Sequence, residues 1–187
     1  MDFEWGSEYS LKFISNVGLI TSNGPFGHNI MSAEWTHMLS YKPFMVSVSI
    51  RPGKASHANM LESKEFGVSL ASAGQDVAAS VAGGFTGKEV DKIALLQELG
   101  VEFYDGKKIK VKMVKDASLN AEFKLVKKIE AGSHTLFIGE AVELSALPKP
   151  PLAYHQGQYW LLGKNVKKPS EETREKIKLL GEKHKRV

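Results

Sequence analysis

Cysteine is absent from the 187 residues of this chain. Its absence excludes a disulfide framework, thiolate metal sites, a cysteine nucleophile and iron–sulfur ligation. A chain that carries no disulfides agrees with a cytoplasmic location, and we expect that location here.

Long apolar runs are absent as well. No uninterrupted apolar segment approaches the roughly 18 residues that a transmembrane helix needs. The first ten residues, MDFEWGSEYS, contain neither the basic nor the apolar region of a secretory signal. We therefore predict neither a membrane span nor a signal peptide.

Several common catalytic and nucleotide-binding motifs are missing. The segment GGFTGKEVDK at residues 83–92 lacks the spacing of a P-loop, and no G-x-G-x-x-G follows a predicted strand. No G-x-S-x-G elbow indicates a serine hydrolase. The six histidines form no i, i+4 pair and have no cysteine beside them, so no metal site is predicted.

The net positive charge of the chain is confined to the C-terminal segment. The net charge is +4, yet residues 164–187 alone carry nine Lys/Arg against four Asp/Glu, which leaves residues 1–163 close to neutral. No platform of aromatic and basic residues accompanies this segment, so we predict a solvated helix and no nucleic-acid partner.

The residues that are present favour one compact domain, since 42% are hydrophobic and the length suits a single core. Alternating apolar residues predict eight or more strands, at 13–21, 28–35, 44–50, 65–70, 108–114, 121–129, 134–144 and, as a terminal hairpin, 152–162. Short helices are predicted at 55–61, 75–82 and 91–99. This pattern indicates a mainly β fold with short helices, in which an antiparallel sheet closes or nearly closes into a barrel.

The predicted strand at 44–50 places Phe44, Val46, Val48 and Ile50 on one face and serines on the other. It runs into a loop with Arg51 and Lys54, and a helix that begins here with Ser56 as its N-cap would add free N–H groups. Guanidinium, ammonium, hydroxyl and helix dipole all favour a phosphate. The residues alone leave two readings open, an anion site or a solvated loop with two cations.

The order of five segments resembles the flavin reductase-like, FMN-binding split-barrel family, which includes flavoredoxin and ferric reductase-like proteins. The first two segments are an N-x-M-[ST]-x-x-W pattern and, after Pro43, an R-x-x-[KR]-x-[ST]-x-x-N pattern, at Asn29, Met31, Ser32, Trp35, Arg51, Lys54, Ser56 and Asn59. The other three are Glu122 in AEFKLV, GSHTLFIGE at 132–140 and PLAYHQGQYWLLG at 151–163. The resemblance implies an FMN-binding split-barrel domain at 1–163, with 164–187 as a basic C-terminal helical extension of the same domain.

The resemblance also implies site residues. The FMN would lie against Asn29, Met31, Ser32, Ala33, Glu34, Trp35, Ser47, Ser49, Arg51, Lys54, Ser56, His57 and Asn59, and His134 would be the catalytic residue. Weaker candidates are Thr86, Lys88 and Lys92 in a loop near the flavin, and Tyr154, His155 and Trp160, which are alternatively core or surface residues. Glu34 stands where relatives often have a small residue, and its carboxylate would disfavour an anionic reduced flavin.

The activity that the resemblance implies is electron transfer from NAD(P)H through FMN to flavin, ferric iron or another small acceptor, by a homodimer. Two alternatives stay open: an electron-transfer flavoprotein that resembles flavoredoxin and does not oxidise NAD(P)H, and a non-enzymatic barrel that binds another phosphorylated ligand.

Overall fold

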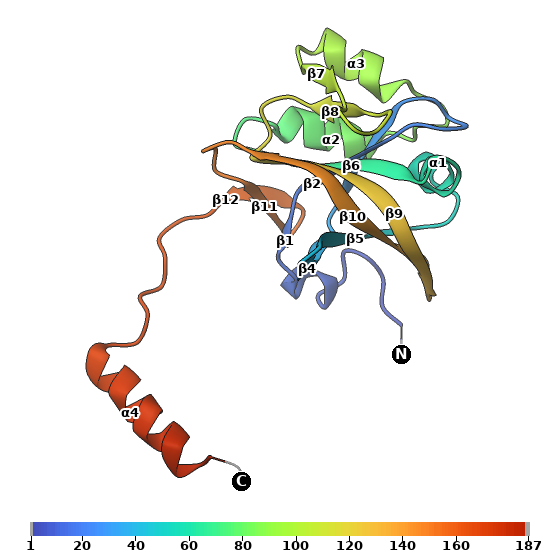
Figure 1. Ribbon diagram of the computed structural model, residues 1–187. Helices are drawn as coiled ribbons and strands as arrows, with labels where there is room; N and C mark the ends of the chain where they lie inside the picture. Colours follow the sequence, from blue (N-terminus) through green and yellow to red (C-terminus); the bar gives the residue numbers. More distant parts are fainter. Residues whose placement is uncertain (1, 186–187) are drawn as a thin grey trace.

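The computed structural model describes residues 2–185, which fold around an antiparallel sheet of seven strands (Figure 1). The strand order is β3-β2-β6-β9-β10-β5-β4, and a three-stranded sheet, β1-β11-β12, and a two-stranded sheet, β7-β8, lie beside it. The bounds are β1 Ser15–Asn16, β2 Gly18–Ser22, β3 Asn29–Ala33, β4 Thr36–Tyr41, β5 Phe44–Ile50, β6 Glu65–Leu70, β7 Phe103–Asp105, β8 Lys112–Val114, β9 Leu119–Ala131, β10 His134–Ala146, β11 Leu152–His155 and β12 Gln158–Leu161.

The large sheet curls on itself without closing, which confirms the predicted split barrel. Its edge strands, β3 and β4, do not pair with each other. The chain between them nevertheless crosses close to β5, because the Ser49 N–H donates to the Trp35 carbonyl at 3.0 Å. The open edge of β3 therefore lies near the end of β5, where the predicted cationic loop begins.

Both faces of the sheet are covered by apolar side chains, since neighbouring residues of a strand point to opposite faces. One core fills the inside of the barrel and contains Ile20, Val48, Phe66, Phe123 and Phe137. A second core lies between the sheet and the helices and contains Leu19, Ile30, Ala79, Leu96 and Val114. Val46, Val48 and Ile50 lie in the barrel core, as predicted for 44–50, but Ser47 on the opposite face is buried as well.

The helices are η1 Ser10–Lys12, α1 Ala55–Ser63, α2 Asp76–Gly84, α3 Lys92–Glu98 and α4 Glu171–Lys183. Asp91 caps α3 through its carboxylate, which accepts from the Ile93 and Ala94 N–H groups, and Gly100 with φ +84° ends the turn after it. Figure 1 shows α4 at the end of an extended segment, away from the body of the protein. None of its side chains is buried, so the predicted C-terminal helix forms but does not pack on the body.

The structure differs from the predicted strands in three main places, and the short strand β7 was also not predicted. The strand expected at 13–21 is broken, because β1 pairs with β11 while β2 pairs with β3 and β6. The strand β4 was not predicted, since Met38 and Leu39 are both exposed and a register shift follows Met38, so no period of two is visible.

The third difference concerns residues 108–114, where only β8 is a strand. The buried carboxylate of Glu122 accepts the backbone N–H groups of Lys107, Lys108 and Ile109 at 2.8, 2.7 and 3.1 Å. These donors are therefore not available to a neighbouring strand. Ile109, Val111 and Met113 are buried, as the alternation predicted, although most of the segment is a loop.

Candidate functional site

The start of α1 presents unpaired donors next to two cations. Lys54 is the N-cap, with extended backbone and no capping side chain, so the N–H groups of Ala55 and Ser56 find no acceptor within the helix. The side chains of Arg51 and Lys54 are exposed, and within residues 2–185 neither forms an ion pair. Two free cations beside a helix start form a geometry that favours an anion such as phosphate.

Ser56 is not the N-cap that the sequence predicted. It is the second residue of α1, it is 1% exposed, and its hydroxyl oxygen accepts a hydrogen bond from the Asn29 side-chain amide at 2.8 Å. This bond ties β3 to α1. Because that hydroxyl accepts from Asn29, its own hydrogen remains available for an anion at the helix start.

Asn29 is also enclosed by the loop after α2. A Cβ atom added to Gly87 would lie 2.1 Å from the Asn29 carboxamide oxygen, so only glycine allows this close approach. Asn59 lies one turn further along α1 and is fully engaged with the protein: it accepts from the Phe26 N–H at 3.0 Å and donates to the Gly27 carbonyl at 2.8 Å. Its geometry supports the turn at 22–27, so any role in cofactor binding is indirect.

Lys92 is a third cation near the same place. Its ammonium is 2% exposed and donates to the carbonyls of Ala82 and Phe85 at 3.0 and 3.3 Å. Burial, and secondly the positive charge of Lys54, lower the pKa of Lys92 to about 8. No carboxylate compensates for its charge, so an anion bound beside Lys54 would stabilise the protonated form.

Trp35 and His134 form an aromatic pair at the opening of the barrel. Their ring centroids are 4.6 Å apart, and the His134 Nδ1 lies 2.9 Å from the Ser133 hydroxyl. Burial lowers the pKa of His134, and the nearby Arg51 guanidinium lowers it further. The structure therefore brings the predicted catalytic histidine to the same opening as Trp35 and Arg51.

His57 packs against β10 on the far side of the helix start. Its Nε2 lies 2.9 Å from the Thr135 hydroxyl, and its ring meets the Phe137 ring edge-on with centroids 5.1 Å apart. Burial lowers the pKa of His57, and the Lys128 charge lowers it further while Glu130 acts in the opposite direction.

The remaining predicted site residues lie on β3 and β5. Met31 packs against the barrel core and Ala33 is buried in it. The Ser47 hydroxyl is 3.5 Å from the His37 carbonyl of β4, and Ser49 is half-buried beside Trp35. The cofactor roles of these four residues stay predictions.

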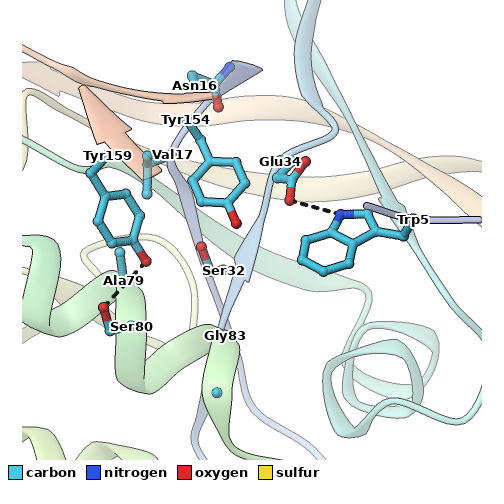
Figure 2. A pocket seen from close by; sticks show the side chains of 11 residues that line it. Trp5, Asn16, Val17, Ser32, Glu34, Ala79, Ser80, Gly83, Tyr154 and Tyr159 are labelled. Atoms are coloured by element: carbon cyan, nitrogen blue, oxygen red, sulfur yellow. Dashed lines mark hydrogen bonds between the residues drawn. The ribbon is translucent and has the colours of Figure 1, made fainter. Parts of the chain in front are cut away.

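Ser32, on the other face of β3, and Glu34, directly after this strand, line a cavity of about 280 Å³ (Figure 2). The Trp5 indole N–H donates to the Glu34 carboxylate at 3.3 Å. Burial raises the pKa of Glu34, partly offset by that hydrogen bond. Tyr154 and Tyr159 form the opposite side of the cavity, with ring centroids 5.6 Å apart.

The weaker candidates are dispersed. Lys88 lies 5.5 Å from the centroid of the Phe26 ring and lines a separate, more open cavity of about 390 Å³, while the Thr86 hydroxyl accepts the Lys88 N–H. Trp160 donates to the His155 carbonyl at 3.0 Å on the surface hairpin β11-β12. Of this group, Lys88 and Tyr154 line cavities and Lys92 lies near the cation Lys54.

Among the described residues, 2–185, no group of three or more His, Asp or Glu side chains is arranged to hold a metal ion. None of the helices in that range is long and apolar enough to cross a membrane.

A split antiparallel barrel with cations at a helix start, beside an open edge strand, defines a class of barrel suited to a phosphorylated ligand. The comparison with protein families is more specific: residues 10–162 match the flavin reductase like domain, and the chain belongs to that family.

Three relatives illustrate the similarity. An uncharacterized protein of Archaeoglobus fulgidus is 30% identical over 149 residues, which are 77% of this chain and 82% of that protein. A protein of the same organism named ferric-chelate reductase (NAD(P)H) is 31% identical over 115 residues, or 62% of this chain and 66% of that protein. The native-state structure of flavin reductase PheA2 has a TM-score of 0.70 and 28% identity, covering 83% of this chain and 95% of that chain.

Sequence reasoning missed the cavity at Glu34. Trp5, Asn16 and Tyr159 line it from three segments that are far apart in the sequence, and no motif links them. Lys92 carried one usable signal, since it stands between the helix N-cap Asp91 and the apolar run IALL at 93–96.

Proposed function

We propose that this chain is an FMN-binding oxidoreductase that passes electrons from NAD(P)H to a small acceptor such as flavin or ferric iron. The observation that carries the proposal is the start of α1, where the free Arg51 and Lys54 side chains and unpaired N–H groups converge. The donor set fits a phosphate monoester, because each charge-assisted hydrogen bond adds roughly 1.5–3 kcal/mol. Family membership supports a flavin as the rest of the ligand.

The open edge of β3 supports the placement of the flavin ring. An edge strand offers unpaired backbone N–H and C=O groups, and these match the polar edge of a flat heterocycle. Residues Met31 to Trp35 would donate and accept along this edge, while Asn29 holds Ser56 toward the phosphate. When bound, the flavin supplies the chemistry of hydride and electron transfer, and the protein supplies position and charge.

We propose that His134 hydrogen-bonds the electron donor or acceptor at the opening of the barrel. Its pKa is lowered by burial and by Arg51, so the imidazole is neutral near pH 7 and can either donate or accept a hydrogen bond. The Trp35 ring lies against the His134 ring at an interplanar angle of 44° and would help to hold its orientation. The name of the ferric-chelate reductase relative supports NAD(P)H as the donor and ferric iron as one acceptor.

We also propose that the chain works as a homodimer in the cytoplasm. The edge strand β4 exposes Met38, Leu39 and Tyr41 at 55%, 51% and 80%, and a second copy would cover such a row. The absence of cysteine agrees with the cytoplasmic part of the proposal.

The experiment is an anaerobic titration of the protein, reconstituted with FMN, with NADH and separately with NADPH. We expect a yellow protein whose visible flavin absorbance is bleached by one or both donors. Bound FMN that neither donor bleaches would indicate the flavoredoxin-like alternative. A protein that stays colourless after incubation with FMN would leave only the non-enzymatic barrel.

A further inference from the structure

Trp5 reaches the cavity at β3 from a segment that precedes the matched family domain. The match begins at residue 10, whereas Trp5 lines the cavity of about 280 Å³ together with Ser32 and Glu34 (Figure 2). The function proposed above places the flavin ring against this part of β3. Trp5 is therefore a wall of the flavin site that the matched domain does not supply.

A tight turn sets the position of Trp5. The Ser7 N–H donates to the Glu4 carbonyl at 3.2 Å, and Gly6, the third residue of this turn, has φ +86°. A type II turn requires such a positive φ at its third residue, which glycine adopts without strain. Trp5 is the second residue, at the tip of the turn, so its indole can lie at the cavity while the rest of the segment stays on the surface.

The indole is held in place weakly. Its N–H donates to the Glu34 carboxylate at 3.3 Å, and Trp5 is 66% exposed while Glu34 is half-buried. The neighbouring Phe3 and Tyr9 side chains are exposed and their rings lie against each other, with centroids 6.2 Å apart. Since a single hydrogen bond shifts an equilibrium by only about 5-fold, the indole can leave the cavity without disturbing the body of the protein.

The opposite wall of the cavity is held more firmly. Tyr154 and Tyr159 belong to the paired strands β11 and β12, and the Tyr159 hydroxyl accepts a hydrogen bond from the Ser80 hydroxyl of α2 at 3.4 Å (Figure 2). Strand pairing and this contact fix the two tyrosines on both sides of the hairpin. Of the two aromatic walls, the one at Trp5 is therefore the one that can move.

The size of the cavity makes this movable wall important. Its volume of about 280 Å³ lies just below the range of small-molecule sites, roughly 300–1,000 Å³. A three-ring flavin would use most of that space, and a nicotinamide that stacks on the flavin needs a second layer. That layer becomes available only when the Trp5 indole is displaced.

We propose that Trp5 is a specificity-determining residue of the flavin site: its indole closes the cavity beside Glu34, and it has to move aside before a nicotinamide ring can stack on the flavin. The inference rests on the function proposed above. It implies that the N-terminal turn slows the reaction with NAD(P)H, whereas small reductants that do not stack on the ring react independently of Trp5.

The closed position of Trp5 is tested first without flavin. The indole N–H resonance of Trp5, assigned by its loss in Trp5→Leu, is followed by NMR in Glu34→Ala. We expect this variant to shift the resonance and to speed the exchange of the indole proton with solvent, because the acceptor is gone. The control Phe3→Leu removes an exposed ring of the same segment that does not line the cavity, and it should preserve both values. An indole resonance that Glu34→Ala leaves unchanged would overturn the proposal.

The second measurement is stopped-flow reduction of the FMN-loaded protein by NADH and by NADPH, with dithionite as the reductant that does not stack. At low nicotinamide concentration we expect Trp5→Leu to react at least about 5-fold faster than the wild type, the equivalent of one hydrogen bond. The gain should lie in the apparent Kd for the nicotinamide and not in the limiting rate, because the open state is more populated. Dithionite should reduce the wild type, Trp5→Leu and Phe3→Leu equally fast.

The outcomes distinguish a failure of the flavin from a failure of Trp5. If none of these proteins binds FMN, the proposed function is contradicted and the role of Trp5 falls with it. If dithionite bleaches bound FMN, but the nicotinamides reduce the wild type and Trp5→Leu equally fast or reduce neither, the role of Trp5 alone is overturned.

Discussion

Lys92 carries a charge that the fold itself does not compensate. Its ammonium is buried and has only carbonyl partners, and its pKa is about 8 against an ordinary value of 10.5. Below pH 8 the lysine is protonated in both the folded and the unfolded chain. Between pH 8 and 10.5 the unfolded chain binds the proton and the folded chain releases it, so the free energy of unfolding rises with pH.

The expected contribution of Lys92 to this rise is about 3 kcal/mol, the equivalent of the change in pKa. It is measured by urea denaturation of the wild type and of Lys92→Met at pH 7, 8.5 and 10. The variant removes the titrating group, so the difference between the two curves isolates Lys92 from the other lysines and tyrosines. A wild-type slope no steeper than that of the variant would show that the ammonium is not buried in solution.

His134 depends on its neighbour Arg51 in a way that can be measured directly. Burial is the larger cause of its lowered pKa and Arg51 the smaller one, so Arg51→Ala should raise the pKa of His134 without returning it to 6.5. The readout is the pH titration of the imidazole resonances by NMR. Arg174→Ala in α4 is the matched control, and an equal shift in both variants would contradict the geometry described for Trp35, His134 and Arg51.

Some of the predicted site residues that lie together are also neighbours in the sequence. Arg51 and Lys54 end one strand and begin one helix, so local rules were sufficient to place them at a helix start. The residue pairs that depend on distant contacts could not be placed from the sequence. Asn29 with Ser56, and Trp5 with Glu34, are joined only by the way in which the sheet folds over.

At the level of the elements, tertiary structure overrides the local sequence pattern most clearly at residues 107–109. A side chain of β9 there accepts the backbone hydrogen bonds that a strand would need. Glu122 is 2% exposed and accepts three backbone N–H groups, which converts a predicted strand into a loop. The hydrophobic periodicity still placed Ile109, Val111 and Met113 in the core correctly. The hydrophobic periodicity therefore predicted which side chains are buried. The hydrogen bonds of the backbone N–H groups to Glu122 determined the secondary structure.

Replacing Glu122 by glutamine should lower the free energy of unfolding by about 2 kcal/mol, because the amide offers one acceptor oxygen in place of two and brings donors that face other donors. Chemical denaturation gives the value. Glu62→Gln, on the exposed surface of α1, should change it by less than about 0.5 kcal/mol. A loss in Glu122→Gln as small as that of the control would contradict the role of this carboxylate.

In the molecule as a whole, the C-terminal helix α4 buries no side chain against the body of the protein. The helix α4 was predicted from Ser170 and the acidic residues after it, and Ser170 does cap it by accepting the Thr173 N–H. The sequence does not decide whether this helix packs on the body or on a second subunit, because its three apolar residues, Ile177, Leu179 and Leu180, favour burial without specifying a surface.

Since no side chain of α4 is buried, deletion of residues 164–187 should leave the melting temperature of the body within about 2 °C of the full-length value. Thermal unfolding followed by circular dichroism measures the change, and light scattering on the same samples gives the oligomeric state. A larger fall in melting temperature, or conversion of a dimer into a monomer, would show that α4 packs on a second copy.

The central claim is that Arg51, Lys54 and the start of α1 hold the phosphate of FMN. The most direct measurement is an FMN fluorescence titration of the wild type, of Arg51→Ala/Lys54→Ala and of the control Lys176→Ala/Lys178→Ala. We predict that the first variant loses at least about 100-fold in affinity, the equivalent of two charge-assisted contacts, and keeps its melting temperature. Equal FMN affinity in all three proteins, or no FMN binding by the wild type, would contradict the account.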